Sequence, residues 1–251
     1  MSKKVVLITG ACGLIGESLL FGLKKENYKL VIIDNNQEKI EELKTKLCNE
    51  SSLFLNKDIL INDSIELCIE EAHKKFGRID CAIHAAYPKS EGWGSKFEDL
   101  KENFLREDIQ NQLGLAIIFS QKIIKYFLQQ GYGNLIHFSS IQGISTPKFE
   151  HYEGTTMSSP IEYSAIKAGI ISITKYLSKY YKYKNLRINC ISPGGIYDNQ
   201  PKQFLNNYKK SCNSKGLLDK KDIIGVVLFL ISENSQFING QNIVVDDGWS
   251  L

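Results

Sequence analysis

The chain alternates short apolar runs with longer stretches of helical pattern, and this alternation constrains its fold more than any other feature. Seven runs are rich in Val, Ile and Leu and are bounded by Gly, Asp, Pro or Ser, as buried strands are. Because helical stretches separate the runs, the sequence predicts a seven-stranded parallel sheet with helices on both faces. We expect a single doubly wound α/β domain of the Rossmann type over residues 1–251. The expected strands are Val5–Thr9, Leu30–Asp34, Leu53–Lys57, Cys81–Ala85, Asn134–Ser139, Arg187–Ser192 and Asn242–Val245.

Composition places the chain among ordinary globular proteins. Its 251 residues are 43% apolar and 24% charged, and the formal net charge of +3 is too small to indicate a nucleic-acid or membrane partner. The six cysteines include no CxxC pair and the four histidines show no metal-ligand spacing, so we expect reduced thiols and no metal. No apolar run approaches the length of a membrane span and no signal sequence precedes the first strand, so we expect a soluble, cytoplasmic protein.

A glycine-rich turn follows the first expected strand. Gly10, Gly13 and Gly16 lie in the sequence TGACGLIG, with Leu14 and Ile15 at the start of the next helix. Glycines in such a turn let the backbone approach a pyrophosphate, and the helix N-terminus offers unpaired N–H groups and a partial positive charge. A plain strand-to-helix turn would look similar, but the position in the first βα unit favours dinucleotide binding.

Asp34 ends the second expected strand, 18 residues after Gly16. A carboxylate at this place can accept hydrogen bonds from the ribose hydroxyls of adenosine and would repel a 2′-phosphate. The next residues are Asn35 and Asn36, with no arginine nearby, so the sequence favours NAD over NADP. Asp34 could instead cap the following helix. Asp58 follows the third strand and is expected near the adenine.

Tyr163 and Lys167 form the strongest candidate catalytic pair. Because they are four residues apart on an expected helix, they occupy one face of it. A phenol has a pKa of about 10, and a nearby ammonium group lowers that value by favouring the phenolate. An isolated Tyr-x-x-x-Lys is usually structural, but here Ser139-Ser140 stands at the end of the fifth strand, ahead of the helix that carries the pair.

Further motifs accompany these residues in a fixed order along the chain. Together the set resembles the short-chain dehydrogenase/reductase family, and the resemblance covers nearly the whole sequence. It implies hydride transfer between a nicotinamide and a carbonyl or secondary alcohol. The motifs are the Gly10–Gly16 turn, Asp34, Asp58, His84-Ala85-Ala86, Ser140, Tyr163–Gly169, Arg187-Ile188-Asn189, Pro193–Ile196, Gly240-Gln241 and Val245–Gly248.

The resemblance also implies a role for individual residues. Tyr163 exchanges the proton with the substrate oxygen, Lys167 holds the nicotinamide ribose, and Ser140 rather than Ser139 hydrogen-bonds the substrate oxygen. Backbone or side-chain contacts with NAD are implied for Gly10, Gly13, Leu14, Ile15, Gly16, Asp34, Asp58, Ile59, Ala85, Ala86, Tyr163, Lys167 and Ile196.

The chain departs from the family pattern at four places. Leu14 stands in the glycine turn where many members carry a further glycine, and Tyr87 places a phenol where a glycine is usual after the fourth strand. Asp198 replaces a threonine that often contacts the pyrophosphate. The helix asparagine that completes the family's proton relay has no clean match: Gln112 aligns with it, and Asn111 lies one residue earlier.

The spacing of 23 positions between Ser140 and Tyr163 is longer than in many members of the family. The additional residues form a polar segment over about 145–160, which we interpret as a substrate loop suited to a hydroxyl-rich ligand. It could also be a surface excursion unrelated to substrate. The loop resembles those of bacterial oxidoreductases of flagellin modification and cell-surface sugar synthesis, which implies a sugar or sugar-phosphate substrate. The segment 87–96 is expected to form the facing wall, with Trp93 as a stacking surface.

Three interpretations of the function remain open on the sequence. The first is a sugar-active dehydrogenase, and the second is a general carbonyl or 3-oxoacyl-thioester reductase, against which Asp34 and the polar loop argue. The third is a dinucleotide-sensing protein without chemistry, which would not need an intact catalytic set. The family resemblance also implies a homo-oligomer, a tetramer or dimer, and the expected long helices Glu98–Gln130 and Pro160–Lys182 carry apolar residues on more than one face.

Overall fold

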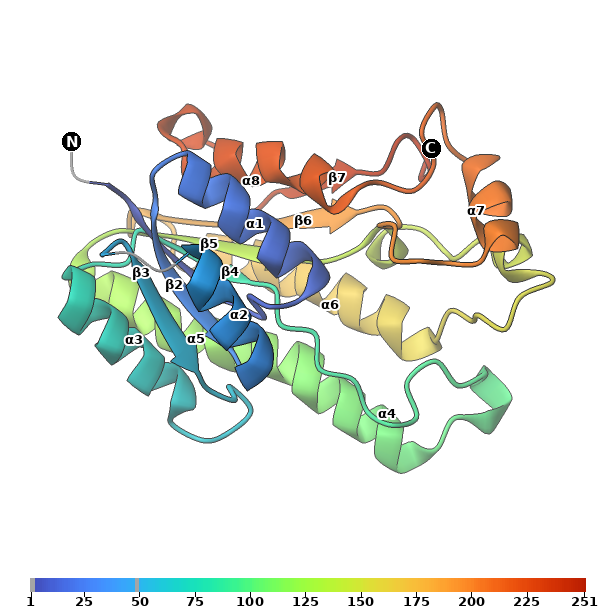
Figure 1. The fold of residues 1–251 in the computed structure, drawn as a ribbon, viewed down its shortest axis with the longest axis horizontal. Helices are drawn as coiled ribbons and strands as arrows, with labels where there is room; N and C mark the ends of the chain where they lie inside the picture. Colours follow the sequence, from blue (N-terminus) through green and yellow to red (C-terminus); the bar gives the residue numbers. More distant parts are fainter. Residues whose placement is uncertain (1–2, 48–49) are drawn as a thin grey trace.

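The computed structural model describes residues 3–47 and 50–251 and contains a seven-stranded sheet (Figure 1). Its strands are β1 (Val5–Thr9), β2 (Lys29–Asp34), β3 (Ser52–Asn56), β4 (Cys81–His84), β5 (Gly133–Phe138), β6 (Leu186–Pro193) and β7 (Asn242–Val245). They pair in parallel in the order β3-β2-β1-β4-β5-β6-β7. The chain therefore runs outward from β1 to one edge, returns to the centre at β4 and continues to the other edge, which confirms the predicted doubly wound fold.

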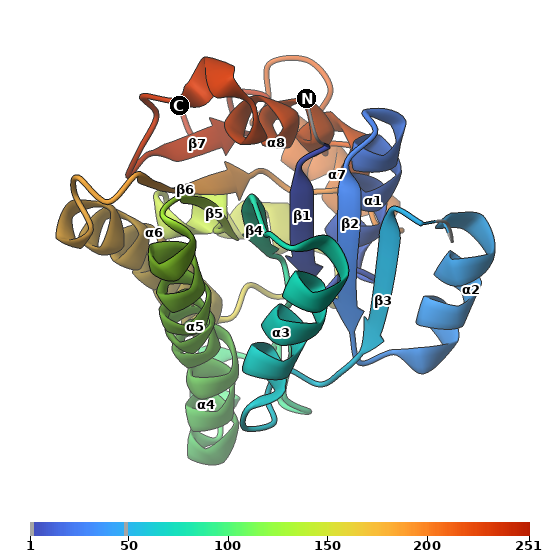
Figure 2. The same ribbon diagram turned by 90° about the vertical axis from the view of Figure 1, so that its left-hand side faces the viewer.

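Helices cover both faces of this sheet (Figure 2). One face carries α1 (Leu14–Lys25), α2 (Gln37–Leu47) and α8 (Ile224–Ile231), and the other carries α3 (Ser64–Phe76), α5 (Leu115–Gln130) and α6 (Ile161–Tyr180). Two shorter helices, α4 (Glu102–Asp108) and α7 (Lys202–Lys209), lie beyond the carboxyl ends of the strands (Figure 1). The residues that follow each strand therefore gather at the edge where α4 and α7 project.

The two-residue period of the strands divides the core into two layers. In β1, Val6 and Ile8 pack against the α1, α2 and α8 layer, whereas Val5 and Leu7 pack against the layer of α3 and α5. All five residues of β1 are buried, because helices cover the sheet on both sides. This explains why the strands read as continuous apolar runs in the sequence.

The prediction of one helix over Glu98–Gln130 is wrong in its first four residues and in one internal turn, whereas residues 102–130 are continuously helical. A single 3₁₀ turn covers Phe97–Asp99, the next two residues are extended, and α4 begins at Glu102. Between α4 and α5 the chain forms a π-helical turn over Ile109–Gly114. This turn packs closely against α6, where a Cβ at Gly169 would come within 2.8 Å of the Leu113 side chain. Helix propensity alone gives no sign of this packing.

The cysteines agree with the expectation of reduced thiols. Cys12, Cys68, Cys81 and Cys190 are buried and free, Cys212 is free and half-buried, and Cys48 lies outside the described residues. Burial raises the pKa of the Cys68 thiol to about 12, so this thiol stays protonated and inert at neutral pH. Within residues 3–47 and 50–251, no helix is both long enough and apolar enough to cross a bilayer.

Candidate active site

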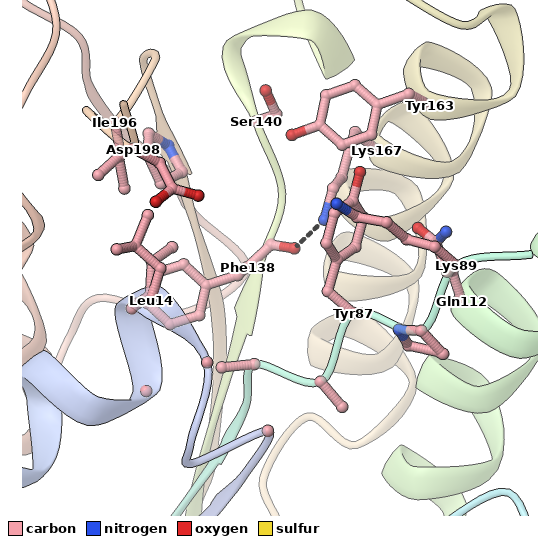
Figure 3. Close-up of a pocket in the computed structure, with 18 of the residues that line it drawn as sticks. Leu14, Tyr87, Lys89, Gln112, Phe138, Ser140, Tyr163, Lys167, Ile196 and Asp198 are labelled. Carbon is pink, nitrogen blue, oxygen red and sulfur yellow. Dashed lines mark hydrogen bonds between the residues drawn. The ribbon is translucent and has the colours of Figure 1, made fainter. Parts of the chain in front are cut away.

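A cavity of about 740 Å³ extends along the carboxyl ends of the strands. It runs past the ends of β1 and β4, the neighbouring strands at which the strand order reverses, where ligands of such sheets bind. In Figure 3, Leu14 and Ile196 lie on one side of the cavity and Tyr163, Lys167 and Gln112 on the other. One end is built from the glycine turn, and the other from residues that follow β4 and β5.

The glycine turn after β1 is packed too closely for side chains. Gly10 has a φ of +65°, and a Cβ there would lie 2.5 Å from the Ala86 Cα, so only glycine fits. The Gly13 N–H donates to the Gly10 carbonyl oxygen at 3.1 Å, and Gly13 precedes α1 without any side-chain cap. The first turn of α1 therefore presents its N–H groups to the cavity, as pyrophosphate binding requires.

Asp34 is held at the cavity by two backbone groups. Its Oδ2 accepts a hydrogen bond from the Cys12 N–H at 2.8 Å, and its Oδ1 accepts one from the Asn36 N–H at 3.0 Å. The cap of α2 is Asn36, whose Oδ1 accepts from the Lys39 N–H at 3.0 Å, so Asp34 does not serve as the helix cap. The Asp34 carboxylate remains half-buried in the cavity wall with lone pairs left for a ligand.

All of the other residues expected to contact the cofactor line the same cavity. Asp58 accepts a hydrogen bond from the Leu60 N–H at 2.9 Å, which fixes its carboxylate beside the end of β3. A dinucleotide fits this cradle, because side-chain-free backbone, unpaired helix N–H groups and a carboxylate follow one another along it. The remaining lining residues of the prediction are Leu14, Ile15, Gly16, Ile59, Ala85, Ala86 and Ile196.

Two adjacent serines at the end of β5 have different partners. The Ser139 hydroxyl donates to the Lys167 carbonyl oxygen at 2.7 Å and so ties β5 to α6. The Ser140 Oγ accepts a hydrogen bond from the Gln142 N–H at 3.2 Å, and its hydroxyl proton is not used in that contact. The Ser139 hydroxyl proton is therefore engaged with the main chain of α6, and the role of Ser140 stays a prediction. Gly143 makes the close approach possible, since a Cβ there would lie 2.7 Å from the Lys167 carbonyl carbon.

Lys167 carries a buried ammonium group with few partners. Its Nζ donates to the Phe138 carbonyl oxygen at 3.2 Å and lies 5.4 Å from the centre of the Tyr163 ring and 5.1 Å from that of Tyr87. Burial lowers the pKa of Lys167 to about 8, because it penalises the charged form. The site therefore holds a cation that is stabilised mainly by one carbonyl and two aromatic rings.

The pKa of the Tyr163 phenol is raised, although its position next to Lys167 suggests a lowered pKa. Burial raises the pKa of Tyr163 above its usual value, and a hydrogen bond with the Ser140 side chain opposes this only in part. The expectation that Lys167 would lower this pKa is therefore not met by the protein alone, because burial has the larger effect. The phenol is protonated at neutral pH.

Gln112 lies in the π-helical turn and lines the cavity, whereas the neighbouring Asn111 does not line it. The Gln112 side chain is 4% exposed, and neither its Oε1 nor its Nε2 has a hydrogen-bond partner among the described residues. A buried, unpartnered amide is costly, and such groups in native proteins usually meet a ligand or an ordered water. Of the two alternatives left by the sequence, Gln112 is the one brought to the site.

The wall after β4 differs from the expectation in one respect. Trp93 does not line the cavity; it packs behind Tyr87, with ring centres 5.4 Å apart, and against Tyr163 at 5.9 Å. Tyr87 takes the place in the wall that was expected for Trp93, because the tryptophan joins the apolar cluster next to α6. The Ser158 hydroxyl donates to the Gly94 carbonyl oxygen, which joins this wall to the 145–160 segment.

Only two residues of the 145–160 segment line the cavity, His151 and Tyr152. This segment therefore contributes fewer polar groups to the cavity than its composition suggests. The remainder of this side is aromatic and comes from distant parts of the chain, which sequence reasoning missed because no local pattern links them to the catalytic motif. These residues are Phe204, Tyr208 and Trp249.

The combination of a dinucleotide cradle and a buried tyrosine–lysine pair is that of a nicotinamide-dependent oxidoreductase. The family model described as enoyl-(acyl carrier protein) reductase matches residues 13–250. The chain belongs to the short-chain dehydrogenase/reductase family, in the branch that this model represents. It is an NAD(P)-dependent oxidoreductase that acts on CH–OH groups.

Similar proteins match over essentially the full length. The chain is 40% identical to post-translational flagellin modification protein A of Campylobacter coli, with 100% of both chains covered. It is 29% identical to 7alpha-hydroxysteroid dehydrogenase of Bacteroides fragilis, over 99% of this chain and 95% of that one. A short-chain dehydrogenase of Leptospira borgpetersenii, solved with bound NAD⁺, superposes with a TM-score of 0.89 at 28% identity and covers 100% of this chain and 94% of that chain.

Proposed function

We propose that this protein is an NAD(H)-dependent dehydrogenase or reductase of a sugar or sugar phosphate used in bacterial surface glycan or flagellin modification. The observation that carries the proposal is the convergence of Ser140, Tyr163 and Lys167 at the end of a cavity whose other end holds the glycine turn and Asp34. A carbonyl or alcohol carbon lying between Ser140 and Tyr163 would face the nicotinamide end of a dinucleotide laid along this cavity.

In the proposed mechanism Tyr163 is the proton donor for reduction. The bound nicotinamide would supply or accept the hydride. The raised pKa of Tyr163 keeps the phenol protonated at neutral pH, so it can donate its proton to the substrate oxygen as the carbonyl carbon becomes an alcohol carbon. Ser140, whose hydroxyl contacts the Tyr163 oxygen in the protein alone, would donate its proton to the substrate oxygen and orient it. In the oxidation direction Tyr163 must first lose its proton, which its raised pKa opposes.

Lys167 and Gln112 would support proton exchange at Tyr163. The Lys167 ammonium lies against the Tyr163 ring and can hydrogen-bond the nicotinamide ribose, and a positive charge there stabilises a phenolate when one forms. The unpartnered amide of Gln112 has both a donor and an acceptor with which to hold a water next to Lys167. Such a water would return a proton to Tyr163 from solvent.

We infer NAD rather than NADP from Asp34, whose fixed carboxylate would lie against a 2′-phosphate. Lys39 and Lys57 line the same end of the cavity and soften this repulsion. The Lys39 Nζ donates to the Cys12 carbonyl oxygen at 3.4 Å, whereas the Asp34 carboxylate is held more closely, by the Cys12 N–H at 2.8 Å and the Asn36 N–H at 3.0 Å. The Leptospira borgpetersenii relative holds NAD⁺, which supports the preference.

A sugar substrate is supported by the resemblance to the Campylobacter coli flagellin modification protein and by the cavity wall. Aromatic rings stack on the apolar faces of sugar rings, and Tyr87, Tyr152 and Trp249 offer such rings next to polar groups. The test is NAD⁺ reduction or NADH oxidation with a panel of sugars, sugar phosphates, hydroxysteroids and 3-oxoacyl thioesters. Turnover confined to the last two classes would refute the proposal.

We also propose a cytoplasmic homo-oligomer, a tetramer or dimer. Ile117 and Ile118 on α5 are about half exposed, and Tyr176 and Tyr180 on α6 are exposed and stacked on each other. Apolar residues on the outer faces of two neighbouring helices suit a symmetric interface. Light scattering at micromolar concentration tests this, and a monomeric mass would contradict it.

A further inference from the structure

The charged residues of the cavity are distributed unevenly. Its three described carboxylates are Asp34 and Asp58 at the adenosine end and Asp198 beside Ile196. Figure 3 shows Asp198 across the cavity from the wall that carries Tyr163 and Lys167. On that catalytic wall the charged side chains among the described residues are Lys167 and Lys89, both cationic. The charged groups that a substrate in front of Tyr163 can touch on this wall are therefore cationic, because the nearby carboxylates of Asp108 and Glu162 are buried and do not line the cavity.

Lys89 and Lys167 differ in how their charges are used. Lys167 is buried and hydrogen-bonded to the Phe138 carbonyl oxygen. Lys89 is exposed, and within residues 3–47 and 50–251 it forms no hydrogen bond or ion pair; its Nζ lies 4.9 Å from the centre of the Tyr87 ring. The ammonium of Lys89 is therefore available to a ligand.

The position of Lys89 relative to the reacting atoms follows from Tyr87. The Tyr87 ring packs edge-on against the Tyr163 ring with centres 5.9 Å apart, so the Lys89 ammonium and the proton donor both lie against the same aromatic ring. Pro88 lies between Tyr87 and Lys89 and restricts the backbone that presents the lysine. Trp93 supports Tyr87 from behind. The backbone that carries Lys89 is thus held in place by Pro88 and by the packing of Tyr87 against Trp93.

We propose that Lys89 selects an anionic substrate: a monosaccharide that carries a phosphate or carboxylate on a carbon away from its reacting C–O group. This inference rests on the proposed function and narrows its substrate class. Because Lys89 and Tyr163 both lie against the Tyr87 ring, a single sugar unit could place its reacting carbon at Tyr163 and its anionic group at Lys89. A lysine ammonium is a flexible point charge with three donors, which suits either anion.

The first test measures anion binding without turnover. Inorganic phosphate and acetate are titrated into the NAD-saturated protein, and dissociation constants are compared for wild type, Lys89→Gln, Lys89→Arg and Lys96→Gln. Lys96 is an exposed lysine of the same wall that does not line the cavity, so it is the matched control. We expect Lys89→Gln to weaken binding of the preferred anion about tenfold or more, because a charge-assisted hydrogen bond is lost. Lys89→Arg, which keeps the charge, should retain most of the affinity.

The two anions distinguish a phosphate from a carboxylate as the natural group. Unchanged dissociation constants in Lys89→Gln for both anions would overturn the inference, as would an equal loss in Lys96→Gln. Lys89 is exposed and forms no hydrogen bond or ion pair with the described residues, so the variants are expected to fold normally, which their melting temperatures would verify.

The second test uses turnover with glucose, glucose 6-phosphate and gluconate, and with other such sets from the substrate panel. Lys89→Gln should lower kcat/KM for the anionic member of a pair about tenfold while leaving the neutral member nearly unchanged. If no sugar is turned over, the proposed function fails, and the anion titration still decides the role of Lys89. If sugars are turned over but neutral ones are preferred by the wild type, the inference about Lys89 fails alone.

Discussion

The Lys167 ammonium lies 5.4 Å from the centre of the Tyr163 ring, and no carboxylate among the described residues forms an ion pair with it. A buried cation without a counter-ion destabilises the fold unless its pKa falls, and the pKa of Lys167 is lowered to about 8. The protein therefore retains a costly charge at the place where the tyrosine and a nicotinamide ribose would use it.

Replacing that charge should stabilise the protein while harming its activity. We expect Lys167→Met to raise the melting temperature at pH 7 by roughly 2–8 °C and to weaken NADH binding. In the wild type the folded pKa is about 8 and the ordinary value is 10.5, so the unfolded state binds more protons between these values and wild-type stability rises with pH there. The gap between variant and wild type should thus be largest below pH 8 and shrink toward pH 10.5. Melting curves of both proteins across this pH range test the expectation. A difference in melting temperature that does not change with pH would contradict it.

Removing the phenolic hydroxyl of Tyr163 should abolish chemistry and little else. We expect Tyr163→Phe to reduce turnover about 10²–10⁴-fold, the usual contribution of a general acid, with NADH affinity nearly unchanged. Tyr176→Phe is the matched control, because Tyr176 is an exposed tyrosine of the same helix. Steady-state kinetics and NADH fluorescence titration give both quantities, and a Tyr163→Phe protein that keeps most of its turnover would disprove the assigned role.

Asp34 should determine the choice of dinucleotide. We expect wild type to bind NADH more tightly than NADPH, and Asp34→Ala to narrow the difference by about tenfold, because the repulsion of the 2′-phosphate is removed. Asp34→Asn removes the charge but keeps one acceptor oxygen for the Cys12 or Asn36 N–H. It therefore distinguishes the effect of the charge on dinucleotide affinity from the effect of a disturbed turn. Glu38→Gln, an exposed carboxylate near the start of α2, is the control. Tighter NADPH than NADH binding by the wild type would contradict the preference.

The close contact between the backbones of Gly10 and Ala86 should tolerate no side chain at position 10. Gly10→Ala combines a φ of +65° with a clash at 2.5 Å, so we expect a loss of stability above 1 kcal/mol, on the order of the strain and overpacking terms together, and loss of NADH binding. Gly77→Ala has a comparable φ of +75° but no atom within 4 Å of the added Cβ, so it reports the conformational cost alone. Denaturant unfolding of both variants gives the two losses of unfolding free energy. Equal losses would mean that the Gly10→Ala clash is relieved by a shift of the backbone.

The unpartnered amide of Gln112 should cost stability and aid catalysis. We expect Gln112→Met to gain about 1 kcal/mol or more of unfolding free energy, since a buried polar group without a partner is removed, and to lose turnover. Gln110→Met changes an exposed glutamine of the same π-helical turn and should do neither. Undiminished turnover in Gln112→Met would remove Gln112 from the proposed mechanism.

The sheet could be predicted from the sequence because its pattern is local. The structure places β1 and β7 at the expected residues and shifts the ends of the other strands by at most one residue, since apolar side chains and bounding Gly, Asp or Pro act within the strand itself. The residues that follow these strands were likewise predictable, because parallel strands bring their carboxyl ends to one edge.

What the sequence could not predict depends on packing between distant segments. Tyr87 and Trp93 are both aromatic residues of one irregular loop, and no periodicity says which of them faces the cavity. The contact of both Lys89 and Tyr163 with the Tyr87 ring arises only when the loop after β4 meets α6. The aromatic residues from α7 and the C-terminal segment join the site for the same reason.

The π-helical turn over Ile109–Gly114 has a consequence for how such a site can change. A turn of this kind holds one residue more than the α-helical turn it replaces. Deleting one residue from it would restore a continuous α-helix and change the directions in which the side chains of the turn point. The direction of the Gln112 side chain is therefore encoded in the length of this segment as well as in its composition. A gain or loss of a single codon, rather than a substitution, would move an amide into or out of this cavity.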